Sequence, residues 1–330
     1  MKKSFLVFLV TIGTVIGSGF LSGKEIVVFF TRFGSVSFLC IPLAFFAFWG
    51  MFYFTLSWGG RALEKLKKSK LSNLVNIFLC VILCGAMFSG SYEIISFAGK
   101  PIAFIGMTII LIFCFYIIKH GIGFLEKVNL FMVPVMVILL VVFDIVLLHG
   151  AHVPSVTNPF SSVSGFYALA YVAFNTSNSG VLLAHLGKDL SKKQKARVSF
   201  FAALVLSLVL LLSNIVLLEN SASFNQEMPL LSLFDGWQKA IMQIVIALGC
   251  VTTLFSLIFT LAGSLRGLIA SPSLSGRLSV FVPLALSLWG FGNIVTYLYP
   301  ISSVLSLLLL SDLFFVPALK QAYQAIHNRR

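Results

Sequence analysis

The chain has 330 residues, of which 59% are hydrophobic and only 10% are charged, and its mean hydropathy is +1.03. Soluble domains carry about 25% charged residues, so this composition excludes a soluble protein and indicates a chain that crosses the membrane many times. A net charge of +13 would favour nucleic acid as the partner of a soluble chain. Here the basic residues lie between apolar segments, so we expect the lipid bilayer as partner and no nucleic acid.

A membrane-spanning helix needs about 20 mostly apolar residues. Ten segments meet this requirement, namely 4–31, 36–60, 73–98, 101–119, 126–149, 165–187, 196–218, 238–266, 277–298 and 300–321. The expected fold is therefore an all-α integral membrane protein with ten transmembrane helices. All five cysteines lie inside these segments, so none is expected to form an extracellular disulfide.

The basic residues test this count of spans, because an error would disturb their alternation between the two sides. Most lysines and arginines fall in segments that share one side of the membrane, at 2–3, 61–70, 119–127, 188–197, 266–277 and 320–330. By contrast, 219–235 contains three acidic residues and no basic one. The positive-inside rule therefore predicts cytoplasmic N- and C-termini in the cell (inner) membrane.

Ten spans divide into two sets of five, and an odd number of spans gives the second set the inverted orientation. The predicted organisation is a first repeat at 1–150, an extracellular linker at 151–163, a second, inverted repeat at 164–325 and a cytoplasmic tail at 326–330. Inverted repeats of this kind are common in secondary transporters, where corresponding spans are often interrupted near the middle of the membrane.

The first span contains the stretch GTVIGSGFLSGKEI, residues 13–26, which is rich in glycine, serine and threonine. A continuous helix from residue 5 to residue 30 would be about 39 Å long, which exceeds the hydrocarbon thickness. Gly17 and Gly19 fall within one turn and weaken the helix there. The alternative is close helix packing, because Gly13/Gly17 and Gly19/Gly23 match the small-xxx-small pattern.

The sixth span favours interruption, because it contains an uninterrupted polar run. Asparagine, threonine, serine and glycine occupy all six positions of 175–180, where a packing face would place polar residues at helical spacing. We therefore predict that helices 1 and 6 are both discontinuous. A broken helix exposes backbone amides and carbonyls to a bound solute or ion.

The motif IGTVIGSGFLSGKEIVVFF, with AFNTSNSG and the following GKDL in the sixth span, resembles the YkvI-type membrane proteins. These are similar to the amino acid–polyamine–organocation superfamily of transporters, which has the leucine-transporter fold. The resemblance implies two inverted five-helix repeats, alternating access, and a solute site between the first, third, sixth and eighth spans. It indicates no particular substrate.

The expected solute is a small amino acid or a related zwitterion. Its carboxylate would accept hydrogen bonds from the amides of Gly17, Ser18 and Gly19. Tyr92 in the third span would donate to the same group. Asn175 and Asn178 would bind the amino group or a polar side chain.

The resemblance also implies a Na⁺ site between the first and eighth spans. The predicted ligands are the carbonyls of Gly13 and Ile16, together with Thr252, Thr253 and Ser256, because hard cations prefer oxygen ligands. The alternative is that these hydroxyls only hydrogen-bond to their own helix, as serine and threonine often do in membranes.

Two acidic residues within the spans, Glu25 and Glu93, are candidates for proton coupling or gating. Glu93 could instead pair with Lys24 or Lys100. Lys24 and Glu25 point about 100° apart on a helix, so they cannot simply pair with each other.

These features predict a secondary active transporter of a small amino acid or related solute, coupled to Na⁺, with H⁺ as the other possible coupling ion. A membrane receptor on the same scaffold, which senses a ligand without net transport, is the alternative. No enzymatic constellation converges on one face, so we expect no enzyme, no cofactor and no metal beyond Na⁺.

Overall fold

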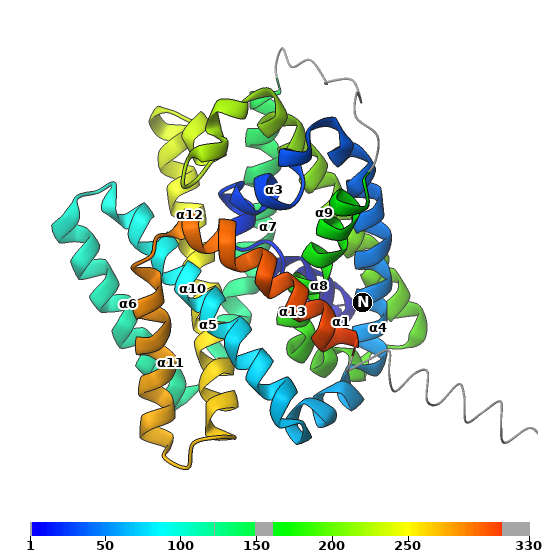
Figure 1. Ribbon diagram of the computed structural model, residues 1–330, viewed down its shortest axis with the longest axis vertical. Helices are drawn as coiled ribbons and strands as arrows, with labels where there is room; N and C mark the ends of the chain where they lie inside the picture. Colours follow the sequence, from blue (N-terminus) through cyan, green and yellow to red (C-terminus); the bar gives the residue numbers. More distant parts are fainter. Residues whose placement is uncertain (1, 122, 149–160, 312–330) are drawn as a thin grey trace, which may run out of the picture.

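The computed structural model describes residues 2–121, 123–148 and 161–311, and these ranges contain helices and connecting turns without a strand (Figure 1). The first apolar segment forms α1 (Lys2–Gly13), α2 (Ser18–Leu21), α3 (Lys24–Phe29) and η1 (Thr31–Val36). Four long helices follow, namely α4 (Ser37–Lys68), α5 (Lys70–Ser96), α6 (Lys100–His120) and α7 (Gly123–Leu147).

The second part of the chain begins with α8 (Ser162–Leu186), η2 (Gly187–Asp189) and α9 (Lys192–Glu219). Two short turns, η3 (Ser221–Asn225) and η4 (Leu231–Leu233), lead to α10 (Gly236–Arg266) and α11 (Pro272–Ser287). The last described segment consists of α12 (Phe291–Asn293), the π-helical turn η5 (Ile294–Leu298) and α13 (Tyr299–Leu310).

Seven of the described segments are long and apolar enough to cross a membrane. They correspond to α4, α5, α6, α7, α9, α10 and the stretch Phe291–Leu310. The polar run of α8 and the sixteen-residue length of α11 keep these two helices out of that set. The structure therefore supports an all-α membrane protein. The predicted linker 151–163 lies mostly outside the described residues, and the tail 326–330 lies outside them entirely.

Helices from the two parts of the chain interleave. The helix α4 packs against α8 and α9, and α5 packs against α10, α11 and α13. In Figure 1, α6 and α11 lie side by side at one edge of the bundle. Only 22% of the apolar window of α6 is buried, whereas 61% of that of α5 is. The helix α5 is therefore central, and α6 is positioned to face lipid.

Serine residues start several of these helices by capping them. The hydroxyls of Ser69, Ser161, Ser191 and Ser271 each accept a hydrogen bond from the amide three residues later. The cap at Ser191 is a full capping box with Gln194. Such caps satisfy amides that have no partner within the helix. The starts of these four helices are thus encoded locally.

Several of the segments that carry basic residues contact one another in the part of the chain that the structure describes, whereas 320–330 lies outside that part. Lys3 forms an ion pair of 2.8 Å with Asp189, which joins the start of α1 to η2. Asn73 donates to the carbonyl of Ser264, and Arg266 donates to that of Ile118. The structure therefore brings together segments that the sequence predicted to share one side.

The predicted interruption of the first span is confirmed. Helical structure stops at Gly13 and resumes at Ser18, and it is interrupted again at Gly23 before α3. Gly23 has a φ of +80°, a left-handed conformation that favours glycine. We refer to residues 14–17 as the break.

The predicted interruption of the sixth span is wrong, because α8 is one continuous helix from Ser162 to Leu186. Its polar side chains bond back to carbonyls of the preceding turn. Asn175 donates to Tyr171, Thr176 to Val172, and Ser179 to Asn175. These bonds satisfy the side chains without unwinding the backbone.

The predicted boundary between the ninth and tenth spans, near residue 299, is also wrong. The helix α11 ends at Ser287, and Gly290, with a φ of +93°, turns the chain into the next span at Phe291. Pro300 lies inside this last span, directly after η5. Proline removes a backbone donor, and a π-helical turn accommodates that loss without ending the helix.

Candidate functional site

The helical hydrogen bonding of the first span ends at the break. The amides of Thr14 and Ile16 still donate to the carbonyls of Val10 and Ile12, and the next bond of this kind starts from Leu21. The amide of Gly17 donates to the carbonyl of Val15 at 2.9 Å, and the backbone of Gly17 is extended. The amide of Leu21 then bonds to Gly17, so the helix resumes. Within the described chain, no backbone amide donates to the carbonyls of Gly13 or Ile16. These two carbonyls are therefore available to another partner.

The glycines around the break also allow close approach of neighbouring side chains. A Cβ atom on Gly13 would lie 2.3 Å from Cγ2 of Val133 on α7, and one on Gly19 would lie 2.0 Å from Oε1 of Glu25. A Cβ atom on Gly17 would meet only the hydroxyl of Thr253, at 3.9 Å. The two interpretations of this motif thus apply to different residues: Gly13 and Gly19 permit packing, and Gly17 lies in the break.

The predicted cation ligands of α10 are partly engaged within their own helix. The hydroxyl of Thr252 donates to the carbonyl of Leu248 at 2.9 Å, and that of Ser256 donates to the carbonyl of Thr252 at 3.2 Å. Thr253 faces Gly17 across the interface between α10 and the break. The structure therefore brings Thr253 to the break.

The predicted solute-binding residues are not all brought together. Ser18 is buried and its hydroxyl donates to the sulfur of Met87 on α5 at 3.1 Å. Asn175 is buried and Asn178 is half-buried on α8. Tyr92 is 46% exposed, because the neighbouring Ser91 is the residue that α5 turns inward. Tyr92 therefore lies away from the buried groups around the break.

The two candidate acidic residues differ in their surroundings. Glu25 is only 5% exposed and its Oε2 has no hydrogen-bond partner among the described residues. Glu93 is half-buried near the end of α5, within electrostatic reach of Glu227. Lys24 turns away from both and donates to the carbonyls of Phe224 and Gln226. Of the two acids, only Glu25 belongs to the interior next to the break.

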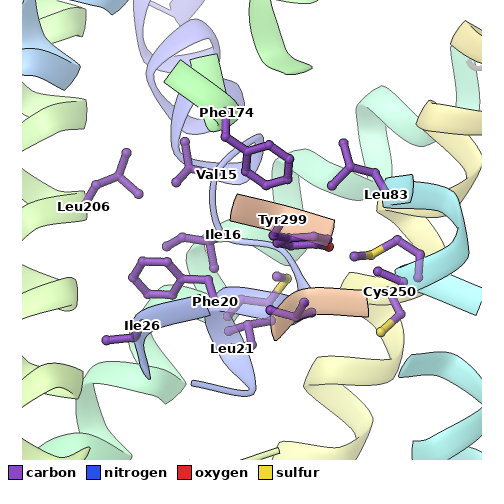
Figure 2. Close-up of a cluster of buried hydrophobic side chains, with 14 of the residues drawn as sticks. Val15, Ile16, Phe20, Leu21, Ile26, Leu83, Phe174, Leu206, Cys250 and Tyr299 are labelled. Atoms are coloured by element: carbon purple, nitrogen blue, oxygen red, sulfur yellow. The ribbon is translucent and has the colours of Figure 1, made fainter. Parts of the chain in front are cut away.

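Two buried tyrosines near Glu25 were not among the predicted site residues. Tyr171 on α8 and Tyr299 on α13 are both 0% exposed, and both interact electrostatically with Glu25. Figure 2 shows Tyr299 beneath Phe174 and beside residues of the first span, and the two ring centroids are 4.7 Å apart. The positions of the tyrosines in the sequence do not predict this arrangement, because the arrangement depends on how three separate helices pack. We call Glu25, Tyr171 and Tyr299 the Glu25 cluster.

The segment between α9 and α10 covers this end of the first span. The amide of Leu230 donates to the carbonyl of Ser22 at 2.8 Å, and Lys24 is held by the two carbonyls named above. The carboxylate of Glu227 also accepts a hydrogen bond from the amide of Gly292, at the start of the last span. The segment thus ties the first and last spans together at one end of the bundle.

No group of three or more histidine, cysteine, aspartate or glutamate side chains in the described ranges could hold a metal ion. The five cysteines are buried and free.

No protein-family model matches the chain. Among curated proteins it is similar to the uncharacterized protein YyaD of Bacillus subtilis, with 23% identity over 330 residues that cover 95% of this chain and 96% of the relative. It is also similar to the uncharacterized membrane protein YkvI of the same organism, with 22% identity over 327 residues, 90% of this chain and 91% of the relative.

Among solved structures, the chain is similar to Mhp1, a nucleobase-cation-symport-1 family transporter, in a closed conformation with bromovinylhydantoin bound. The TM-score is 0.64 at 14% identity, over 95% of this chain and 78% of Mhp1. The fold is the leucine-transporter fold. The inward-facing conformation of Mhp1 gives a TM-score of 0.53 at 16% identity, over 95% and 77% of the two chains. At 14% and 16% identity, these likenesses show the fold alone.

Proposed function

We propose that this protein is a secondary active transporter that moves a small amino acid or a related solute by alternating access. The observation that carries the proposal is the break, which leaves two backbone carbonyls free in the first span of a chain with a transporter fold. Discontinuous helices in such folds commonly form the binding site near the membrane centre. We further propose ten spans in two inverted sets of five, with both termini cytoplasmic.

The proposed solute site adjoins the break. The amides of Gly17, Ser18 and Gly19 would receive a carboxylate, and Asn175 and Asn178 would receive the polar end of the solute. The burial of Ser18 and Asn175 supports this assignment, since both lie in the interior that the break enters. The exposed position of Tyr92 removes the support for a direct contact with the solute.

The proposed coupling ion is Na⁺, with H⁺ as the alternative. Na⁺ would bind the free carbonyls of Gly13 and Ile16 and the hydroxyl of Thr253, with Thr252 and Ser256 completing the site. A hydroxyl that donates to its own helix keeps an oxygen lone pair, so the bonds of Thr252 and Ser256 are compatible with cation binding.

One end of the proposed pathway is closed by the segment between α9 and α10. The bonds from Leu230 to Ser22 and from Gly292 to Glu227 must break before the first and last spans can separate at that end. The higher TM-score with the closed conformation of Mhp1 is in keeping with this arrangement.

A thermal-shift screen of purified protein with amino acids, with and without Na⁺, tests the proposal first. A ligand at about 100 times its Kd stabilises the native state by about 2.7 kcal/mol, which raises the unfolding temperature measurably. Hits are then tested for counterflow in proteoliposomes. Counterflow is the expected result. Ligand binding without counterflow would contradict transport and favour the receptor.

A further inference from the structure

The Glu25 cluster consists of three buried side chains with unsatisfied polar atoms. Oε2 of Glu25 and the hydroxyls of Tyr171 and Tyr299 have no hydrogen-bond partner among the described residues. Most buried polar groups in proteins are hydrogen-bonded, and an orphaned group calls for an explanation. Here three such groups come from α3, α8 and α13, so their convergence is a product of the tertiary fold.

Aromatic packing holds the two tyrosine rings in place. The ring of Tyr171 lies between Phe29 and Phe30, with centroid distances of 5.2 Å to each, and Phe48 packs against it at 6.0 Å. The ring of Tyr299 is packed against Phe174 at 4.7 Å. Neither hydroxyl is free to swing toward solvent, because both side chains are fully buried and their rings are packed on neighbouring aromatic rings.

Among the described residues, no positive charge neutralises Glu25. Lys24 points to the carbonyls of Phe224 and Gln226, and Arg32 of η1 stacks over the ring of Tyr167 at 4.1 Å. Glu219 in the last turn of α9 is another acid. No ion pair to Glu25 occurs in the described parts of the chain.

The other neighbours are also uncharged. Tyr171 faces Glu25 from α8, and Tyr299 faces it from α13. Beyond Tyr299 lie the thiols of Cys84 and Cys250 on α5 and α10. Tyr297 of η5 is 58% exposed and stacks on Trp289, so it faces outward. A carboxylate in such a site has lost its hydration without gaining a counter-ion, and it is most stable with a proton bound.

We propose that the Glu25 cluster is a proton-binding site, in which Glu25 carries the proton and the hydroxyls of Tyr171 and Tyr299 orient it. This proposal rests on the proposed transport function and specifies H⁺ as an ion that moves with the solute. The proton comes from water on one side and binds the Glu25 carboxylate. It leaves to water on the other side when opening of the bundle hydrates the site.

The packing around Glu25 favours a proton over a larger ligand. Oε1 lies so close to Gly19 that a methyl group there would sit at 2.0 Å from it, which leaves no room for a solute on that side. Na⁺ needs several oxygen ligands arranged around it. A proton needs a single acceptor and no cavity, so it suits three oxygens in a tightly packed site.

Gly19 also links the Glu25 cluster to the break, since it lies in α2 directly after the break and in contact with Glu25. Movement of α2 on solute binding therefore displaces the carboxyl group. This contact gives a direct route by which the solute site and the proton site affect each other.

Infrared difference spectroscopy on the purified full-length protein tests the proton site without a known substrate. The wild type is expected to show the C=O stretch of a protonated carboxyl group at neutral pH, and Glu25→Gln is expected to lose it. Tyr171→Phe and Tyr299→Phe should keep the band and shift its frequency, because the hydrogen bonding of the acid changes. Glu93→Gln, which alters a half-buried carboxyl outside the cluster, should leave the band unchanged.

Proteoliposomes with an imposed pH gradient, given a radiolabelled amino-acid mixture from outside, test the coupling. A pH gradient of one unit can drive about a tenfold accumulation if one proton moves with each solute. The wild type should approach this value, whereas Glu25→Gln should equilibrate the label without accumulation and still catalyse counterflow. Counterflow shows that the variant is folded. If Glu25→Gln proves unstable, the frequency shifts of the two tyrosine variants still test the site.

Three results would overturn the proton site: no carboxyl band assignable to Glu25, a band that Na⁺ removes, or proton-driven accumulation by Glu25→Gln equal to that of the wild type. Failure of the transport proposal gives a different result, namely no flux by the wild type under any gradient. The infrared band of Glu25 is independent of flux, so the two failures are distinguishable.

Discussion

Residues 13–23 of the first span and residues 175–180 of α8 are alike in composition, since both are rich in small and polar residues. The first stretch is broken twice, whereas the second is a regular helix. The difference lies in the residue types. Asparagine, threonine and serine bond back to the preceding turn of α8, while glycine has no side chain with which to do so. A polar run within a membrane helix is therefore weaker evidence for a break than a cluster of glycines.

The largest effect is expected at the end of α8, where Gly187 packs against α4. A Cβ atom there would lie 2.2 Å from the carbonyl oxygen of Leu56, which is backbone and cannot move aside. Gly187→Ala should destabilise the protein by roughly 3 kcal/mol, the upper part of the usual range for overpacking. Thermal unfolding measures this. Gly263→Ala, where a Cβ meets nothing within 4 Å, is the matched control. Equal melting temperatures for the two variants would show that α8 does not pack as described.

Two threonines test whether the break and α8 differ in function. Thr253 faces the break, whereas Thr176 is buried and bonds to its own helix. Thr253→Val should lower ion-driven uptake by about tenfold, because loss of one polar ligand is worth about 1 to 1.5 kcal/mol. Thr176→Val should reduce uptake by less than about twofold, since its hydroxyl serves only the helix. Ion-driven uptake into proteoliposomes measures both effects. A larger loss of uptake in Thr176→Val than in Thr253→Val would place the ion site in α8.

The continuity of α8 predicts a smaller, stabilising effect at Gly180. This glycine lies within the helix, and a Cβ there would meet no atom within 4 Å. Gly180→Ala should raise the free energy of unfolding by roughly 0.5–1 kcal/mol, because alanine loses less backbone freedom in a helix. Denaturant or thermal unfolding measures the gain. A decrease in stability would indicate that the backbone is unwound there after all.

The smallest effect is expected for the exposed ion pair between Lys3 and Asp189, which joins the start of the first span to η2, directly after α8. Hydrogen bonding to Lys3 holds the pKa of Asp189 below its ordinary value of 3.8. A lowered pKa means that the pair stabilises the fold above that ordinary value and that this contribution is lost as the pH falls below it. The difference in melting temperature between wild type and Asp189→Asn should therefore be small and constant from about pH 5 to 8. A steep change within that window would contradict this assignment.

Much of the fold was predictable because it depends on local signals. Apolar segment lengths and the alternation of basic residues indicated the spans, and Gly17 with Gly19 indicated the interruption of the first one. The boundary between the last two spans was misplaced, because the apolar run continues through Pro300, which lies inside the last span beside a π-helical turn. Gly290, in the motif WGFGN, was the available signal for the true boundary.

The candidate site was predicted only in part. Gly17 and Thr253 meet as expected. Tyr92 faces outward, because its neighbour Ser91 is the residue of α5 that faces inward, and a sequence pattern does not resolve a difference of one position. The charged pair Lys24 and Glu25 diverge as their adjacent positions require. The side chain of Lys24 is held by the segment between α9 and α10. The side chain of Glu25 lies near Tyr171 of α8 and Tyr299 of α13.

The sequence by itself determined that the chain is an α-helical membrane protein and that its first span is interrupted, because apolar length and glycine clustering act through local backbone energetics. Only the tertiary structure decided which side chains surround the break. Tyr171 and Tyr299 are separated by more than a hundred residues, and they come near Glu25 only because α3 packs against α8 and η5, while α13 packs against α8. Contacts of that kind depend on the relative rotation and depth of helices, which hydrophobic patterning leaves open when nearly every face is apolar.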